Sequence, residues 1–255
     1  MTGRVNASRV ERHGAPVAWL EVDRRDRLNI LSTPLIEALT AEIAGLGGSG
    51  VRAAVLTGAG DRAFVGGADI HEMAGLEPAS ARAFITGLHR LCAAVRDAPV
   101  PVVARIEGHC YGAGLELAAA CDLRVAAEGA SFGMPEVHVG IPSVIEAALL
   151  PGLIGAARAR DLVMTGRRID AREALDWGLI SRLAPREDLD AAVDAVLAEL
   201  IAAGPEALRL QKRLCNDWDR VPLPQAVALG IDAFAEAYAG DEPRRMMRAF
   251  LDRKR

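Results

Sequence analysis

The feature that most constrains the fold is the order of the apolar segments along the chain. Up to about residue 185, short β-branched segments typical of strands alternate with longer segments that have the 3.6-residue period of helices. Beyond that point the apolar segments all have helical periodicity. This order predicts an α/β fold with a mostly parallel sheet, followed by a helical region. The strand-like segments include 16–23, 51–60 and 99–108, and the helical ones include 34–47, 80–98 and 114–122.

The composition narrows the classes of protein to consider. The chain has 255 residues, of which 51% are hydrophobic and 25% charged, and this suits one large domain with or without an appendage. The net charge of −4 does not indicate nucleic-acid binding. No apolar run approaches the ~20 residues of a membrane helix. The N-terminal segment also lacks the apolar core of a signal peptide, so we expect a cytoplasmic protein without membrane contact.

The cysteines and histidines do not form a recognisable metal motif. Because the cysteines show no CxxC spacing, we expect buried free thiols rather than a zinc site or a disulfide framework. His71 has no HExxH partner. No metal site is therefore predicted. The four cysteines are Cys92, Cys110, Cys121 and Cys215.

Two glycine turns are candidates for binding a ligand through the backbone. Gly112 and Gly114 lie between a predicted strand and a predicted helix, but Leu117 occupies the third position of a GxGxxG motif, so a dinucleotide site is not favoured. Backbone N–H groups at such a turn, next to a helix N-terminus, suit a developing oxyanion such as that of a thioester carbonyl. Residues 64–73 contain a second turn of this kind. The alternative is that both turns are only tight corners.

Two glutamates lie in apolar surroundings. Glu116 is flanked by glycine, alanine and leucine, and Glu136 directly follows Pro135. Burial disfavours the ionised form of a carboxyl group and raises its pKa. Two carboxyl groups in unlike environments can therefore divide the roles of acid and base.

Four segments together resemble the enoyl-CoA hydratase/isomerase superfamily, the crotonases. The resemblance extends from about Pro16 to the C-terminus. It implies a crotonase-like spiral of ββα units in residues 1–195 and a C-terminal helical region, 196–255, that builds homotrimers, commonly paired into homohexamers. The four segments are VRAAVLTGAGDRAFVGGADIHEM, EGHCYGAGLELAAACDLRVAAEGASFGMPEV, AREALDWGLISRLAP and MMRAFLDRKR.

The resemblance also implies the chemistry. The substrate is an acyl-CoA thioester whose carbonyl oxygen lies between the N–H groups of Ala68 and Ala113. Glu116 and Glu136 match the two catalytic glutamates of the hydratases. Glu116 acts as the base that delivers water to the β-carbon of a 2-enoyl-CoA, and Glu136 acts as the acid at the α-carbon. Coenzyme A is part of the substrate, and no separate cofactor is expected.

The same resemblance places the coenzyme A moiety. It should lie along the loop at Arg27 and Leu28, with its adenine near residues 66–70. The basic tail, Arg253–Lys254–Arg255, is a candidate for contacts with the nucleotide phosphates, and a solvated chain end is the alternative. The predicted binding residues are Arg27, Leu28, Gly66, Gly67, Asp69, Ile70, Gly112, Pro135 and Val144.

One stretch departs from the hydratase pattern. Typical hydratases continue after the second glutamate with a glycine-rich segment, whereas this chain has bulky Val144 and Ile145 followed by a third carboxylate, Glu146. Ser143 and Glu146 have the spacing of a helix capping box, which we expect to be their role. The alternative is a catalytic carboxylate, as in some isomerases of the superfamily. An isomerase, another acyl-CoA lyase or hydrolase, and a non-catalytic acyl-CoA-binding relative therefore remain alternatives to a hydratase.

His138 follows Glu136 by two positions. If this segment is a strand, the two side chains share one face. His138 could then tune the glutamate or contact substrate, although a plain strand position is the expected role.

Overall fold

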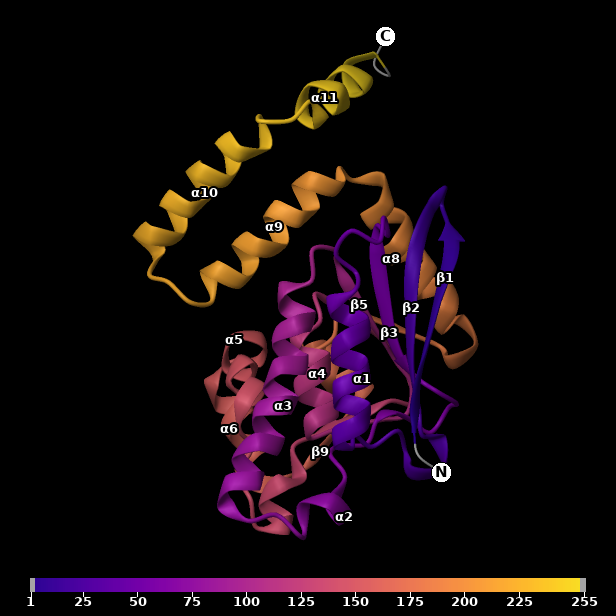
Figure 1. Ribbon diagram of the computed structural model, residues 1–255, viewed down its shortest axis with the longest axis vertical. Coiled ribbons are helices and arrows are strands. Elements are labelled where there is room, and N and C mark those ends of the chain that lie inside the picture. Colours follow the sequence, from indigo (N-terminus) through magenta and orange to yellow (C-terminus); the bar gives the residue numbers. More distant parts are fainter. Residues whose placement is uncertain (1–2, 253–255) are drawn as a thin grey trace.

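The computed structural model describes residues 3–252 and contains two β-sheets with helices packed around them (Figure 1). The larger sheet has the strand order β1-β2-β3-β5-β7-β10. β1 and β2 form an antiparallel hairpin, and every other neighbouring pair in this sheet is parallel. Its strands are β1 (Arg4–Arg12), β2 (Ala15–Asp23), β3 (Ala53–Gly58), β5 (Val102–Ile106), β7 (Leu123–Ala127) and β10 (Arg182–Ala184).

The smaller sheet gives the fold its spiral character. Each of the strands β3, β5 and β7 of the large sheet is followed in the chain by a short strand of the small sheet, whose order is β4-β6-β8-β9. The chain thus passes repeatedly from one sheet to the other, as the predicted ββα units require. The short strands are β4 (Ala63–Val65), β6 (His109–Tyr111), β8 (Ser131–Gly133) and β9 (Arg168–Asp170).

Helices cover both faces of the large sheet. On one face, α1 (Thr33–Ala44), α3 (Pro78–Asp97) and α4 (Ala113–Ala120) enclose the main hydrophobic core. On the other face, α8 (Leu189–Ala202) packs four buried side chains against strand residues such as Val55 and Val103. The predicted boundary between residues 195 and 196 falls inside α8. The remaining helices before it are η1 (Arg25–Arg27), α2 (Ile70–Met73), η2 (Pro135–Val139), η3 (Ile145–Leu149), α5 (Leu150–Ile154), α6 (Ala156–Thr165), α7 (Ala171–Asp176) and η4 (Arg186–Asp188).

Helix α4 lies at the centre of the core. All eight of its residues are buried, which agrees with a sequence that is apolar on every side except at Glu116. The guanidinium of Arg124 donates to the carbonyl oxygens of Ala118 and Cys121 at the C-terminal end of this helix, where a cation offsets the helix dipole. The helix is therefore fixed in position at the end remote from its N-terminal turn.

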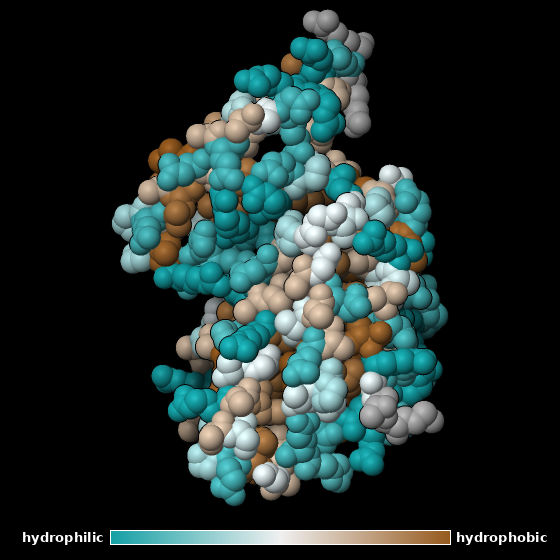
Figure 2. Space-filling model, viewed as in Figure 1, coloured by the Kyte–Doolittle hydropathy of each residue, from teal (hydrophilic) through white to brown (hydrophobic). Residues whose placement is uncertain are grey.

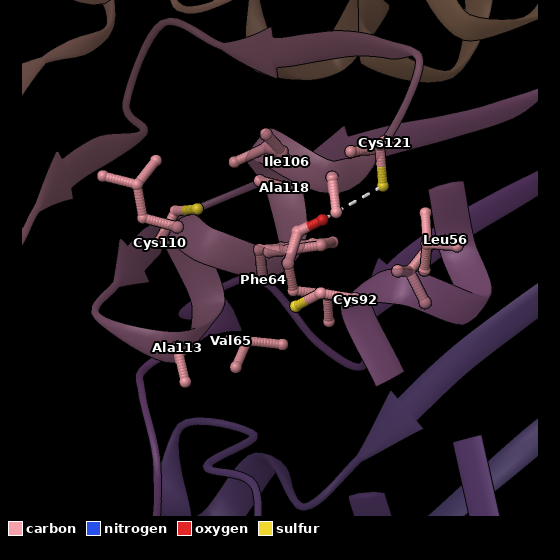
Figure 3. Packing of buried hydrophobic residues seen from close by; sticks show 14 of the residues in the cluster. Leu56, Phe64, Val65, Cys92, Ile106, Cys110, Ala113, Ala118 and Cys121 are labelled. Carbon is pink, nitrogen blue, oxygen red and sulfur yellow. Dashed lines mark hydrogen bonds between the residues drawn. The ribbon is translucent and has the colours of Figure 1, made fainter. Parts of the chain in front are cut away.

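Three of the four cysteines are buried free thiols, as predicted (Figure 3). Cys92, Cys110 and Cys121 pack among the apolar side chains of the core, and the Cys121 thiol donates to the carbonyl oxygen of Leu117 at 3.4 Å. The prediction was wrong for Cys215, which is exposed on α9. It was wrong because cysteine's average preference for burial does not decide which face of an amphipathic helix it occupies.

The last helices extend away from the sheets (Figure 1). α9 (Pro205–Trp218) packs against α10 (Leu223–Ala237), and α11 (Glu242–Asp252) continues outward. Figure 2 shows hydrophobic side chains gathered over the region of α10. We call the exposed apolar residues of these two helices the α10–α11 stripe: Leu223, Val227, Ile231, Phe234, Tyr238, Met246, Met247, Phe250 and Leu251.

Residues 3–252 include no helix that is both long enough and apolar enough to span a bilayer.

Candidate active site

The two predicted glycine turns lie side by side in the structure. They follow β4 and β6, which are parallel neighbours, so their C-terminal ends meet at one edge of the small sheet. A Cβ atom on Gly114 would lie 2.1 Å from the carbonyl oxygen of Val65, and one on Gly67 would lie 3.5 Å from that of Tyr111. Glycine at position 114 is therefore what allows the first turn of α4 to pack directly against β4.

The candidate oxyanion donors, Ala68 and Ala113, occupy these turns. Ala113 is the first residue of α4, where the helix has N–H groups without intrahelical acceptors. The bridge between the Ala68 turn and Leu31 uses the N–H of Asp69 and the carbonyl of Gly67, not the Ala68 N–H. Within residues 3–252, neither of the two alanine N–H groups has a hydrogen-bond acceptor. Both are available to a ligand.

Glu116 lies in the first turn of α4 and is only 4% exposed. Its Oε1 atom accepts a hydrogen bond from the backbone N–H of Ala147 at 3.1 Å. Burial raises the pKa of Glu116 from its ordinary value of 4.5 to about 8, and the negative charges of Glu136 and Glu146 act in the same direction. The hydrogen bond from Ala147 opposes this rise. Glu116 is thus a buried acid with proton affinity in the range useful for catalysis near neutral pH.

Glu136 approaches the same turn from η2. Its Oε2 atom accepts a hydrogen bond from the Ser143 hydroxyl at 2.8 Å, and burial raises its pKa. A Cβ atom on Gly112 would lie 2.6 Å from its Oε1 atom, and Gly112 has a φ of +52°. Glycine is therefore required at position 112 both for the backbone conformation and for access of the carboxyl group. Pro135, the first residue of η2, fixes the start of this helix.

The two carboxyl groups differ in proton affinity. The pKa of Glu116 rises further than that of Glu136, which is half-buried and receives the Ser143 hydrogen bond. Burial thus raises the proton affinity of both carboxyl groups. The roles of base for Glu116 and acid for Glu136 stay predictions.

The capping box predicted for Ser143 and Glu146 is wrong. Ser143 donates to Glu136, and η3 begins at Ile145 without a side-chain cap. Glu146 is 7% exposed, and its Oε1 atom lies 2.9 Å from Nδ1 of His89 on α3. The capping prediction failed because Ser143 bonds to Glu136 and Glu146 contacts His89. The short-range hydrogen bond of a capping box therefore does not form.

The predicted strand around His138 is also wrong. Residues 135–139 form the 3₁₀ helix η2, so Glu136 and His138 do not share a strand face. The ring of His138 contacts the carbonyl oxygen of Thr165 through Nε2 at 2.8 Å. This places His138 in a contact with the end of α6 rather than beside Glu136.

Two of the loops predicted to bind coenzyme A are bonded to each other. The Gly66 N–H donates to the Leu28 carbonyl oxygen at 2.8 Å, so the two loops are joined. Arg27 and Ile70 are exposed, Ile70 by 58%. Asp69 is different, because its buried carboxylate accepts from Arg24 at 2.7 Å and from the His71 N–H at 3.0 Å. It stabilises the start of α2 and has little capacity left for a ligand.

An apolar cavity of about 640 Å³ opens between α2, α3 and the segment after η2. Val144 lies in its wall together with Ile141 and Pro142. In the chain, Pro142 and Val144 flank Ser143, the hydrogen-bond partner of Glu136. Phe84, Ile85 and Met73 supply apolar surface from the helices.

Sequence reasoning missed three parts of the site. Ser143 was assigned only to a cap, and the Ala147 N–H and the His89 ring were not considered. Backbone donors carry no residue-type signal. His89 had a weak residue-type signal. It lies four residues after Ile85 and three before Cys92, so it shares their face of α3. The tail Arg253–Lys254–Arg255 lies outside the described residues.

Among residues 3–252, no group of three or more histidine, cysteine, aspartate or glutamate side chains is arranged to hold a metal ion.

Comparisons with known proteins agree with this architecture. The crotonyl-CoA hydratase of Syntrophomonas wolfei is 33% identical over 94% of this chain and 93% of its own length. The short-chain-enoyl-CoA hydratase of Clostridium acetobutylicum is 30% identical over 94% and 92%. The crystal structure of an enoyl-CoA hydratase from Bacillus anthracis superimposes with a TM-score of 0.92 at 31% identity, covering 98% of this chain and 96% of that one. A sequence model of the enoyl-CoA hydratase/isomerase family matches residues 12–255, and this chain belongs to that family.

Proposed function

We propose that this protein is an enoyl-CoA hydratase, which adds water across the 2,3 double bond of a 2-enoyl-CoA thioester. The observation that carries the proposal is the pair Glu116 and Glu136 beside the unpaired N–H groups of Ala68 and Ala113. Two carboxyl groups can hold and polarise one water, and two N–H donors can stabilise a thioester oxyanion. The hydratases among its relatives support the same reaction.

The proposed reaction proceeds through an enolate-like thioester. The water oxygen bonds to the β-carbon while one of its protons passes to the Glu116 carboxylate. The π electrons move toward the thioester oxygen, which the N–H groups of Ala68 and Ala113 stabilise. Glu136 then gives its proton to the α-carbon as the carbonyl re-forms. Hydration therefore ends with Glu116 protonated and Glu136 ionised.

The raised pKa of Glu116 suits this group to receive a proton from water. A new water bound between the carboxyl groups would donate a hydrogen bond to Glu116, which stabilises its ionised form and lowers its pKa. Binding of the substrate water would thereby favour the ionised Glu116 that the reaction needs.

The acyl chain would extend into the apolar cavity lined by Val144 and Phe84. Its volume of about 640 Å³ exceeds what the short crotonyl group needs, so longer 2-enoyl chains should bind as well. Coenzyme A, as part of the substrate, would lie along Arg27, Leu28 and Gly66, and the reaction would require no separate cofactor. We place this activity in the cytoplasm.

The α10–α11 stripe supports an oligomer. It presents side chains such as Phe234, 69% exposed, and Ile231, 67% exposed, along one side of α10. Apolar surface of this extent on isolated helices is covered by another subunit in stable proteins. We expect a homotrimer, with a homohexamer of two trimers as the alternative.

The test follows the loss of conjugated-thioester absorbance with crotonyl-CoA and with a longer 2-enoyl-CoA. Glu116→Gln and Glu136→Gln should each reduce kcat by about 100-fold to 10,000-fold, because each removes one proton-transferring group. Glu42→Gln, on the exposed surface of α1, is the matched control and should retain activity. Full activity in either active-site variant would refute the assigned roles.

The same experiment separates the alternatives. Isomerisation would convert a 3-enoyl-CoA into the conjugated 2-enoyl-CoA, with uptake of solvent deuterium and no hydrated product. A protein that only binds acyl-CoA would show saturable binding and no turnover of any of these thioesters.

A further inference from the structure

The turn that leads into η3 has a strained backbone. Ile145 has a φ of +37°, a region that L-residues avoid and that is especially unfavourable for a β-branched side chain. Such a conformation persists only where the surrounding contacts hold it in place. The bond of the neighbouring Ala147 N–H to Glu116 is one such contact.

A second contact comes from Glu146 and His89. Glu146 Oε1 lies 2.9 Å from Nδ1 of His89, while its buried Oε2 atom has no hydrogen-bond partner among the described residues. The His89 bond thus ties this carboxylate to α3, and the buried Cys92 thiol of the same helix also interacts with it. The side chain of His89 is 54% exposed, so the ring bridges a buried carboxylate and solvent.

These bonds form one continuous connection to the active site. His89 on α3 holds the side chain of Glu146, and Glu146 is joined by a peptide bond to Ala147. The N–H of that peptide bond donates to Oε1 of Glu116 at 3.1 Å and also to the carbonyl oxygen of Val144 at 2.9 Å. A displacement of the Glu146 side chain would therefore move the donor that orients Glu116.

We propose that the His89–Glu146 pair positions Glu116, acting through the strained turn at Ile145 and the N–H of Ala147. The Glu146 side chain is only 8% exposed and its Oε2 atom is buried, so in this proposal the pair acts through Ala147 and not on the substrate itself. This role rests on the proposed function of Glu116 as the group that receives the proton of water. A displacement of a catalytic group by about 1 Å can lower the rate about 100-fold.

The first test compares three variants of α3. His89→Leu removes the bond to Glu146, and the exposure of this site makes the variant compatible with folding. We expect kcat to fall about 10-fold to 100-fold with KM changed less than about twofold, because the coenzyme A contacts lie elsewhere. His89→Gln can still donate to Glu146 and should recover most of kcat. Arg90→Gln, at the next exposed position of α3, is the matched control.

The second test asks whether the strain at Ile145 connects the His89–Glu146 pair to Glu116. Ile145→Gly removes the penalty of a positive φ, so the turn no longer needs the His89 bond to hold its conformation. We expect the loss of kcat caused by His89→Leu to be several-fold smaller in the Ile145→Gly background. An equal loss in both backgrounds, or a loss that His89→Gln does not recover, would overturn the positioning role.

A substrate-free measurement distinguishes failure of this inference from failure of the proposed function. At pH 6 Glu116 is protonated, and its C=O stretch can be assigned by infrared difference spectra between the protein and Glu116→Gln. Because a hydrogen bond to an oxygen weakens its C=O bond, loss of the Ala147 donor in His89→Leu should raise the stretching frequency. An unchanged band would refute the connection even in an active hydratase. Conversely, a shifted band in a protein without hydratase activity would refute only the proposed reaction.

Discussion

Glu116→Gln should stabilise the protein increasingly as the pH rises from about 4.5 to about 8. In the unfolded chain the carboxyl of Glu116 has its ordinary pKa of 4.5, whereas burial raises the pKa to about 8 in the folded protein. Below pH 4.5 both states are protonated, and the fold carries no ionisation penalty. Between the two pKa values the unfolded chain releases the proton first, so the folded state loses stability as pH rises.

The magnitude follows from the interval between the two pKa values. At about 1.4 kcal/mol for each tenfold change in proton affinity, the penalty reaches an upper limit of about 5 kcal/mol above pH 8. Glutamine has nearly the same shape, can accept the same hydrogen bond from Ala147 and does not titrate. Removing this carboxyl should therefore gain stability at the expense of activity.

The assay is denaturant unfolding of both proteins at pH 5, 6, 7 and 8. One protein concentration is used throughout, because the proposed subunit association would contribute to the apparent stability. The difference in unfolding free energy should widen steadily in favour of Glu116→Gln. Glu42→Gln, which removes an exposed carboxyl of α1, controls for the general effect of charge. A difference that stays constant between pH 5 and pH 8 would refute the reasoning that burial raises the proton affinity of Glu116.

Three further predictions address other parts of the structure. Gly112→Ala should lower kcat more than about 10-fold in a turnover assay, because its Cβ would lie 2.6 Å from Oε1 of Glu136. It should also destabilise the protein by about 1 kcal/mol or more in unfolding experiments, because φ at this position is +52°. Ser143→Ala removes a hydrogen bond that lowers the pKa of Glu136, so the limb of the kcat/KM–pH profile that belongs to Glu136 should move to higher pH. Phe234→Asp places a charge in the α10–α11 stripe and should shift the sedimentation mass toward the monomer, whereas an unchanged mass would exclude this surface from the interface.

The sequence predicted the main elements of the fold because their apolar periodicity is strong. The buried strands β3 and β5 and the amphipathic helix α3 lie where the pattern placed them. The edge strand β1 was not predicted, because most of its residues are exposed and its polar sequence lacks the alternation of a half-buried strand. The short strands β4 and β9 were missed because three residues are too few to show a period.

The site was predictable only where side-chain identity carries the signal. Glu116 and Glu136 stood out as carboxyl groups in apolar surroundings, and the glycine turns marked a place where backbone donors can meet a ligand. The Ala147 N–H and the His89–Glu146 bond arise from contacts between residues 31 and 57 positions apart. Long-range pairs of this kind depend on the packing of α3, α4 and η3, which local patterns do not encode.

The position of the α10–α11 stripe in the chain has a consequence for biosynthesis. Residues 223–251 leave the ribosome after both sheets and the helices around them, so the body can fold before the apolar surface exists. At about 5–20 residues per second, the helices that bear the stripe take only a few seconds to make. In the proposed oligomer, the interface would therefore emerge last, and newly made neighbours on the same messenger RNA would be the nearest partners to cover it.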